Sequence, residues 1–94
     1  MNFIIQYHEL VIKEDIPKIP NSIKIQLKKA IEHKLMTNPE IFGKPLRRSL
    51  KGYKKLRVGN YRIIFRIEQT IVKIFYINHR SVVYKKTQSS RENA

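Results

Sequence analysis

Apolar and polar residues alternate most regularly between residues 53 and 66, on both sides of the pair Gly59-Asn60. Alternation with a period of two is typical of β-strands, and a two-residue loop containing glycine joins such strands in a β-hairpin. One face of this hairpin is predicted to be core and carries Leu56, Val58, Tyr61, Ile63, Phe65 and Ile67. The other face carries Tyr53, Lys55, Arg57, Arg62 and Arg66. The turn places Arg57 opposite Arg62, and this repulsion between like charges suggests a negatively charged partner such as phosphate.

The first half of the chain predicts one strand and two helices. Residues 2–7 are rich in β-branched and aromatic side chains, which favour a strand. Residues 9–16 have the apolar spacing of a short helix, which Pro17 limits. Residues 22–36 predict the clearest helix, because apolar residues recur every three or four positions along one face.

Further strands are predicted after the hairpin. Residues 71–77 are strongly β-forming, residues 78–81 are expected to be a polar loop, and residues 82–84 a short final strand. This order favours an α+β fold, with the two N-terminal helices packed on one face of a mainly antiparallel, four- to five-stranded sheet. Because the length permits one two-layer core, we expect a single domain over residues 1–86 and a flexible tail over residues 87–94.

Charge divides the chain into two unlike halves. The 94 residues have a formal net charge of +13. Residues 1–40 contain 6 Lys/Arg against 5 Asp/Glu, a net charge of +1, whereas residues 41–94 contain 14 against 2, a net charge of +12. Basic residues on alternating strand positions favour nucleic acid over a membrane surface as the partner. An acidic protein partner and a merely soluble basic face are the alternatives.

The residue types narrow the possible chemistry. Without any cysteine, the chain has no disulfide and no thiol nucleophile. The basic half offers only Glu68, Glu92 and His79 as metal ligands or catalytic partners, so we expect no metal and no other cofactor. Cleavage of RNA requires less, because its 2′-OH is the nucleophile and the protein has only to position the backbone, stabilise charge and move two protons. No membrane span or secretion signal is apparent, so a cytoplasmic protein is expected.

Three segments together resemble a known family. Leu50-Lys51-Gly52, the hairpin residues 56–65 and the run His79-Arg80-Ser81-Val82-Val83-Tyr84 are similar to the core of the RelE/ParE toxin superfamily of bacterial type II toxin-antitoxin systems. The resemblance implies a microbial-RNase-like fold. For the RelE branch it implies an endoribonuclease that cleaves mRNA in the ribosomal A site without a metal. This chain differs from the common pattern at Phe65, where tyrosine is frequent, and at Asn78, where glycine is frequent.

The resemblance also implies roles for individual residues. Lys55 is a candidate for proton transfer or phosphate contact, Arg62 and Arg80 for stabilising the phosphate, and Tyr84 for stacking on the substrate nucleotide. Which residue is the general base and which the general acid stays open. The candidates for RNA binding are Arg57, Lys54, Tyr53, Arg66, His79, Arg47 and Arg48.

A partner and two alternative functions follow from the same resemblance. A toxin must be kept silent in its host, so we expect a hetero-oligomer with an acidic antitoxin protein that neutralises the basic half. The ParE branch implies inhibition of DNA gyrase without nuclease activity, and retention of the arginine and tyrosine set favours the RNase instead. A non-catalytic RNA-binding module is the third hypothesis.

Overall fold

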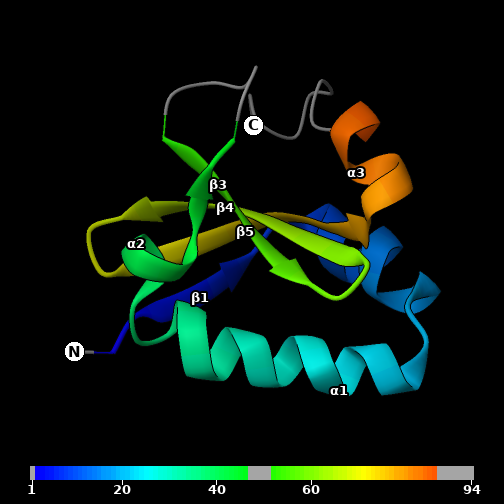
Figure 1. The fold of residues 1–94 in the computed structure, drawn as a ribbon, viewed down its shortest axis with the longest axis horizontal. Helices are drawn as coiled ribbons and strands as arrows, with labels where there is room; N and C mark the ends of the chain where they lie inside the picture. Colours follow the sequence, from blue (N-terminus) through cyan, green and yellow to red (C-terminus); the bar gives the residue numbers. More distant parts are fainter. Residues whose placement is uncertain (1, 47–51, 87–94) are drawn as a thin grey trace.

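A five-stranded sheet forms the centre of the computed structural model, which describes residues 2–46 and 52–86, with the backbone alone for residues 84–86 (Figure 1). The strand order is β1-β5-β4-β3-β2. The strands are β1 (Ile4–Tyr7), β2 (Lys44–Pro45), β3 (Tyr53–Val58), β4 (Tyr61–Glu68) and β5 (Ile71–His79). Among the described strands, only the β1–β5 pair is parallel, so the predicted mainly antiparallel sheet is confirmed.

The β3–β4 hairpin has the predicted turn and the predicted register. Val58 pairs with Tyr61 across the turn, and Arg57 pairs with Arg62. Gly59 has a φ of 59°, whereas Asn60 has no positive φ. Glycine at the first central position, followed by a residue of ordinary φ, is typical of a type II′ turn, whose twist matches that of the flanking strands.

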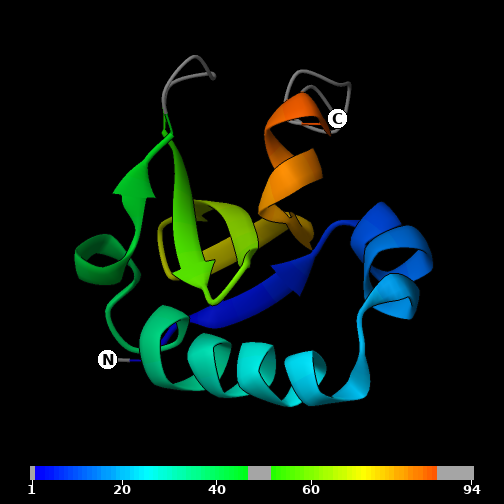
Figure 2. The same ribbon diagram turned by 45° about the vertical axis from the view of Figure 1, so that its right-hand side comes forward.

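The N-terminal helices lie on one face of this sheet, as predicted (Figure 2). After β1 the chain forms a single π-helical turn, η1 (Val11–Asp15), and a 3-10 turn, η2 (Ile16–Lys18). The long helix α1 (Asn21–Ala30) continues into a second π-helical turn, η3 (Ile31–Leu35). A short helix, α2 (Pro39–Phe42), then leads to β2.

The hydrophobic core between these helices and the sheet contains the apolar stripe of the long helix. It consists of Val11, Ile19, Leu27, Ile31, Leu35, Leu56, Ile63, Phe65, Val72, Ile74 and Ile77. Val58, Tyr61 and Ile67 pack against its edge. The hairpin face predicted to be core is therefore confirmed.

The last described element is a helix where the sequence predicts a loop and a strand. Asn78 and His79 end β5, and α3 (Arg80–Lys86) begins directly afterwards, so the predictions for residues 78–81 and 82–84 are wrong. Strand propensity is a weak preference that tertiary packing overrides, and Val83 is fully buried in the core on the second face of the sheet. This second core consists of Leu46, Tyr53, Ile64, Phe75, Tyr76 and Val83.

One buried carboxylate pairs with a backbone amide near the end of β5, the second strand in the sheet order. β1 ends at Tyr7, opposite Ile74, so the last residues of β5 lack a strand neighbour on that side. Asp15, which is 1% exposed, accepts a hydrogen bond from the backbone N–H of Ile77 at 3.0 Å. A buried amide is satisfied in this way.

Among the described residues, no helix is long and apolar enough to cross a membrane.

Candidate nucleic-acid interface

The candidate site is a basic groove beside the turn half of the hairpin, with a volume of about 440 Å³. We call it the basic groove. Five of its seven lining residues are cationic and none is acidic; the residues are Lys34, Phe42, Lys44, Lys55, Leu56, Arg57 and Arg62. Three of the predicted site residues, Lys55, Arg57 and Arg62, therefore lie together.

Strand register explains why these cations share one surface. Lys44 on β2 pairs with Lys55 on β3, and Arg57 on β3 pairs with Arg62 on β4. Directly paired residues project from the same face with Cβ atoms about 4.5–5.5 Å apart, and like charges at that separation repel. An anion bound between them relieves the repulsion, because each cation then gains an opposite charge nearby.

Arg62 is held in place by the turn that precedes it. Arg62 is 7% exposed. Its Nη1 donates hydrogen bonds of 2.9 Å to the carbonyl oxygens of Gly59 and Tyr61. A guanidinium has five N–H donors, and within the described part of the chain the other three have no partner. Arg62 is thus fixed by two contacts and retains donors for a phosphate.

Asn78 lies opposite Arg62 on the next strand. Its Nδ2 donates to the Ile77 carbonyl at 2.8 Å. The buried Oδ1 has no hydrogen-bond partner among the residues that the structure describes. Leaving a buried acceptor unsatisfied costs free energy of folding. The Asn78 side chain thus places an unpaired acceptor on the residue that pairs with Arg62.

Two of the predicted RNA-binding residues are engaged in internal contacts. The Tyr53 ring is 2% exposed and packs edge-on against Phe75 at 5.2 Å between ring centroids. Arg66 donates from Nη1 to the Tyr53 hydroxyl at 3.0 Å and from Nε to Glu68 at 2.6 Å. These contacts give both residues a structural role, and their part in RNA binding stays a prediction.

Glu68 neutralises two neighbouring cations at the other end of the hairpin. Its carboxylate forms ion pairs with Arg66 and Lys73, which are themselves directly paired across β4 and β5. Hydrogen bonding from Arg66 is the main reason why the pKa of Glu68 lies below its ordinary value. The basic groove has no equivalent carboxylate among its described lining residues.

The start of α3 lies next to the hairpin turn, outside the basic groove. The backbone N–H of Arg80 donates to the Asn60 carbonyl at 2.7 Å, and the Arg80 side chain is exposed. His79 Nδ1 accepts from the Ser81 N–H at 3.1 Å, which satisfies a free amide in the first turn of the helix. Its ring also packs edge-on against Tyr61.

The remaining predicted residues fall elsewhere. Lys54 pairs with Phe65, a core residue, and so projects from the sheet face opposite to that of Lys55. Tyr84 lies in α3, but its side chain is outside the described part of the structure. Arg47 and Arg48 also lie outside the described residues.

Three residues of the basic groove are absent from the sequence prediction. Lys44 lies in the short strand β2, and only the pairing of β2 with β3 brings it to Lys55. Lys34 and Phe42 come from η3 and α2, and the ammonium of Lys34 lies 5.5 Å from the centre of the Phe42 ring. No local pattern signals this contact, because the hydrophobic periodicity of the long helix does not specify what its polar residues face.

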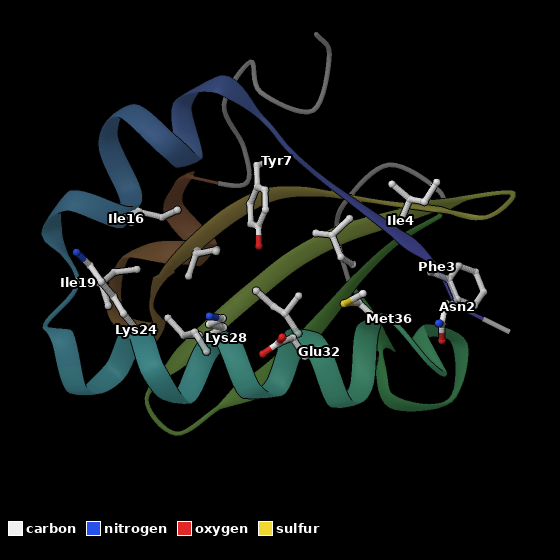
Figure 3. Close-up of a pocket in the computed structure, with 14 residues that line it drawn as sticks. Asn2, Phe3, Ile4, Tyr7, Ile16, Ile19, Lys24, Lys28, Glu32 and Met36 are labelled. Carbon is white, nitrogen blue, oxygen red and sulfur yellow. The ribbon is translucent and has the colours of Figure 1, made fainter.

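A second concave surface lies between β1 and α1, with a volume of about 720 Å³ and a mostly apolar lining (Figure 3). Tyr7 points from β1 towards the long helix, whose last turn, η3, carries Glu32 (Figure 3). Burial raises the pKa of Tyr7, and the negative charge of Glu32 adds to the effect.

Among the described residues, no three His, Cys, Asp or Glu side chains gather as a metal site requires.

Similarity to known proteins covers most of the chain. The family model for the ParE toxin of type II toxin-antitoxin systems (parDE) matches residues 5–84. Toxin RelG of Mycobacterium tuberculosis is 36% identical over 76 residues, covering 79% of this chain and 87% of the relative. Toxin RelE of the same organism is 33% identical over 73 residues, covering 76% of this chain and 75% of the relative.

A solved structure supports the same assignment. The toxin-antitoxin complex RelBE2 of Mycobacterium tuberculosis contains a chain with a TM-score of 0.76 and 30% identity, covering 85% of this chain and all of that chain. The chain belongs to the RelE/ParE family of toxins of type II toxin-antitoxin systems.

Proposed function

We propose that this toxin is a ribosome-dependent endoribonuclease that cleaves mRNA in the A site without a metal. The observation that carries the proposal is the basic groove, where Lys55, Arg57 and Arg62 meet without an acidic lining residue in the described structure. The relatives named RelG and RelE, at 36% and 33% identity, support the assignment to the RelE branch.

The proposed chemistry uses the RNA as its own nucleophile. The 2′-oxygen bonds to the adjacent phosphorus while the bond from phosphorus to the 5′-oxygen breaks, which leaves a 2′,3′-cyclic phosphate and a 5′-hydroxyl. One group accepts the 2′-hydroxyl proton and another donates a proton to the leaving oxygen. Arg62 and Arg57 stabilise the charge on the phosphate, and Lys55 either transfers a proton or binds the phosphate. Arg80 and Tyr84 act from α3 on the same nucleotide.

An acidic antitoxin is the proposed second partner. Structures similar to this chain are of complexes between toxins and antitoxins. The half of the chain from residue 41 to residue 94 has a net charge of +12, so a partner of opposite charge associates favourably with it. We propose a hetero-oligomer in which the antitoxin keeps the toxin inactive.

The second candidate function is that of the ParE branch, gyrase inhibition without nuclease activity. Its support is the matching family model, which carries the ParE description. The two candidates differ in one result, because only the first produces new mRNA ends. Inhibition of DNA supercoiling by the Arg62→Ala, Tyr84→Ala protein, together with intact mRNA after incubation with the wild type, would favour the second.

Programmed ribosomes test the first candidate. Purified toxin is incubated with ribosomes that carry a defined mRNA, and the mRNA ends are mapped. We expect cleavage by the wild type and by Lys29→Ala, which removes an exposed α1 lysine that lines neither concave surface. We expect the rate to fall at least about 100-fold in Lys55→Ala and Arg57→Ala. Intact mRNA at saturating wild-type protein would refute the proposal.

A further inference from the structure

The basic groove contains one large apolar side chain that the proposed chemistry does not use. Phe42, at the end of α2, is 40% exposed. It lines the groove together with Lys34 and Lys44, on elements other than the hairpin that carries Lys55, Arg57 and Arg62. An exposed aromatic ring next to several cations combines a flat apolar surface with positive charge, which is the composition of a nucleotide-binding surface.

Close packing fixes the position of this ring. Gly43 follows Phe42, and a Cβ atom placed on Gly43 would lie 2.4 Å from Cζ of Phe65 and 2.8 Å from the Pro39 carbonyl oxygen. The Gly43 N–H also donates to that carbonyl at 2.9 Å. Because Phe65 is fully buried and Pro39 is buried too, the end of α2 is held directly against the core. Phe42 is therefore mounted on a rigid base.

The contact with Lys34 orients the Phe42 ring and places a positive charge beside it. The Lys34 ammonium lies 5.5 Å from the ring centre, within the range of a cation–π interaction. Lys44 lies two residues after Phe42 and pairs with Lys55 across β2 and β3. The ring thus has a cation from the helical side and a row of cations along the sheet.

We propose that Phe42 stacks on a base of single-stranded RNA, with Lys34 and Lys44 contacting the phosphates that flank it. This nucleotide subsite, defined by Lys34, Phe42 and Lys44, extends the phosphate-binding part of the groove at Arg57 and Arg62 and rests on the function proposed above. A ring that stacks on a base is tolerant of sequence, because every base has a π-face. The subsite therefore aligns the strand for cleavage and adds affinity.

Binding of an RNA that cannot be cleaved tests the subsite without requiring turnover. The probe is a short, fluorescein-labelled single strand with 2′-O-methyl groups, and its affinity is measured by anisotropy. Stacking of one base is worth about 1–3 kcal/mol, so we expect Phe42→Ala to bind about 5- to 150-fold more weakly. Phe42→Trp retains a stacking surface and is expected to bind as well as the wild type.

Ile41 provides a matched control on the same short helix. It is 76% exposed and does not line the basic groove, so Ile41→Ala is expected to leave RNA affinity unchanged. Equal affinities of Phe42→Ala and Ile41→Ala would overturn the inference. Probes with a single abasic position add a second readout: one position should weaken wild-type binding and leave Phe42→Ala binding unchanged. Equal losses in both proteins at every position would also contradict stacking on Phe42.

Failure of this inference and failure of the proposed function give different results. If wild type and Phe42→Ala cleave ribosomal mRNA at the same sites with the same KM and bind the probe equally, the nuclease proposal stands and the subsite does not. If Phe42→Ala alone binds the probe weakly while no protein cleaves mRNA, the subsite stands as an RNA-binding surface and the nuclease proposal fails.

Discussion

Arg62 and Arg66 lie on the same strand, β4, but differ in the groups that their guanidinium nitrogens contact. Arg66 contacts Glu68 and the Tyr53 hydroxyl, whereas Arg62 uses one guanidinium nitrogen for the turn carbonyls and has no carboxylate partner among the described residues. A guanidinium without an ion pair, held by two hydrogen bonds, is arranged for an external anion. The role of each of these two arginines therefore depends on its neighbours as much as on its place in the sequence.

Glu68 predicts a pH-dependent difference in stability. Its pKa is lowered in the folded state by Arg66, so its contribution is fully present above the ordinary glutamate pKa of about 4.3 and is lost as the pH falls through the lowered value. Glu68→Gln is expected to unfold at lower urea concentration than the wild type at pH 7, since Arg66 and Lys73 then repel each other. The difference should shrink as the pH falls through that lowered pKa, and a gap as large in acid as at pH 7 would contradict the assignment.

Gly43 predicts a packing defect. Its φ is ordinary, so the reason for glycine is the close approach of Phe65 and Pro39. Gly43→Ala forces the added methyl group into the core, and overpacking of this kind costs about 1–3 kcal/mol in the free energy of unfolding. Urea denaturation of this variant beside Ile41→Ala, which is expected to be near neutral, measures the effect. A Gly43→Ala protein as stable as the wild type would show that α2 moves freely.

At the scale of elements, the β3–β4 hairpin is the part that local rules determine best. Its register sets Arg57 opposite Arg62, and its turn carbonyl from Gly59 holds the Arg62 side chain. The carbonyl of the other turn residue, Asn60, accepts the first N–H of α3. The hairpin turn therefore links two candidate arginines, Arg62 and Arg80, that come from different elements.

Substitution of the turn glycine tests the geometry of the hairpin turn. Gly59 has a positive φ and open space around it, so Gly59→Ala meets backbone strain and no clash. We expect a loss of at least about 1 kcal/mol in the free energy of unfolding, whereas Asn60→Ala, at an ordinary φ, is expected to lose less. Thermal melts of both variants measure this. Equal losses would argue against the type II′ geometry.

The hairpin and the long helix were predictable because their signals are local. Alternation and a glycine-containing turn fix the register of residues 53–66, and spacing of 3.6 identifies the buried side of α1. The helix α3 was not predictable in this way, because Val82 and Val83 favour a strand and the burial of Val83 against Tyr53 and Tyr76 depends on distant residues. The candidate cations of the hairpin were predictable because they follow from its local alternation. The contributions of Lys34, Phe42 and Lys44 were not, because they depend on which elements pack together.

At the scale of the whole molecule, charge and fold divide together. The nearly neutral first 40 residues supply β1 and the helices on one face, and the basic remainder supplies the hairpin, β5 and α3. The positive field therefore belongs mainly to one part of the fold, where it attracts a polyanion and guides its approach. This arrangement suits both of the proposed partners, RNA and an acidic antitoxin.

The salt dependence of RNA affinity distinguishes the cations of the basic groove from cations elsewhere on the surface. Each lysine or arginine that contacts a phosphate of a single strand contributes about 0.7 to the slope of log affinity against log salt concentration. We expect Lys44→Ala and Arg57→Ala each to reduce that slope by about 0.7 with the uncleavable RNA probe. Lys29→Ala, outside the groove, is expected to leave the slope at the wild-type value, and a uniform reduction in all three would show that the binding is not localised.

The central claim is that the toxin cleaves mRNA through the 2′-OH of the substrate. The most direct measurement compares two mRNAs on programmed ribosomes, one wholly RNA and one with a single 2′-deoxy nucleotide on the 5′ side of the cleaved bond. We predict cleavage of the first by the wild-type protein, with a cyclic phosphate end, and no cleavage of the second at that bond. Equal cleavage of both mRNAs, or of neither, would contradict the account.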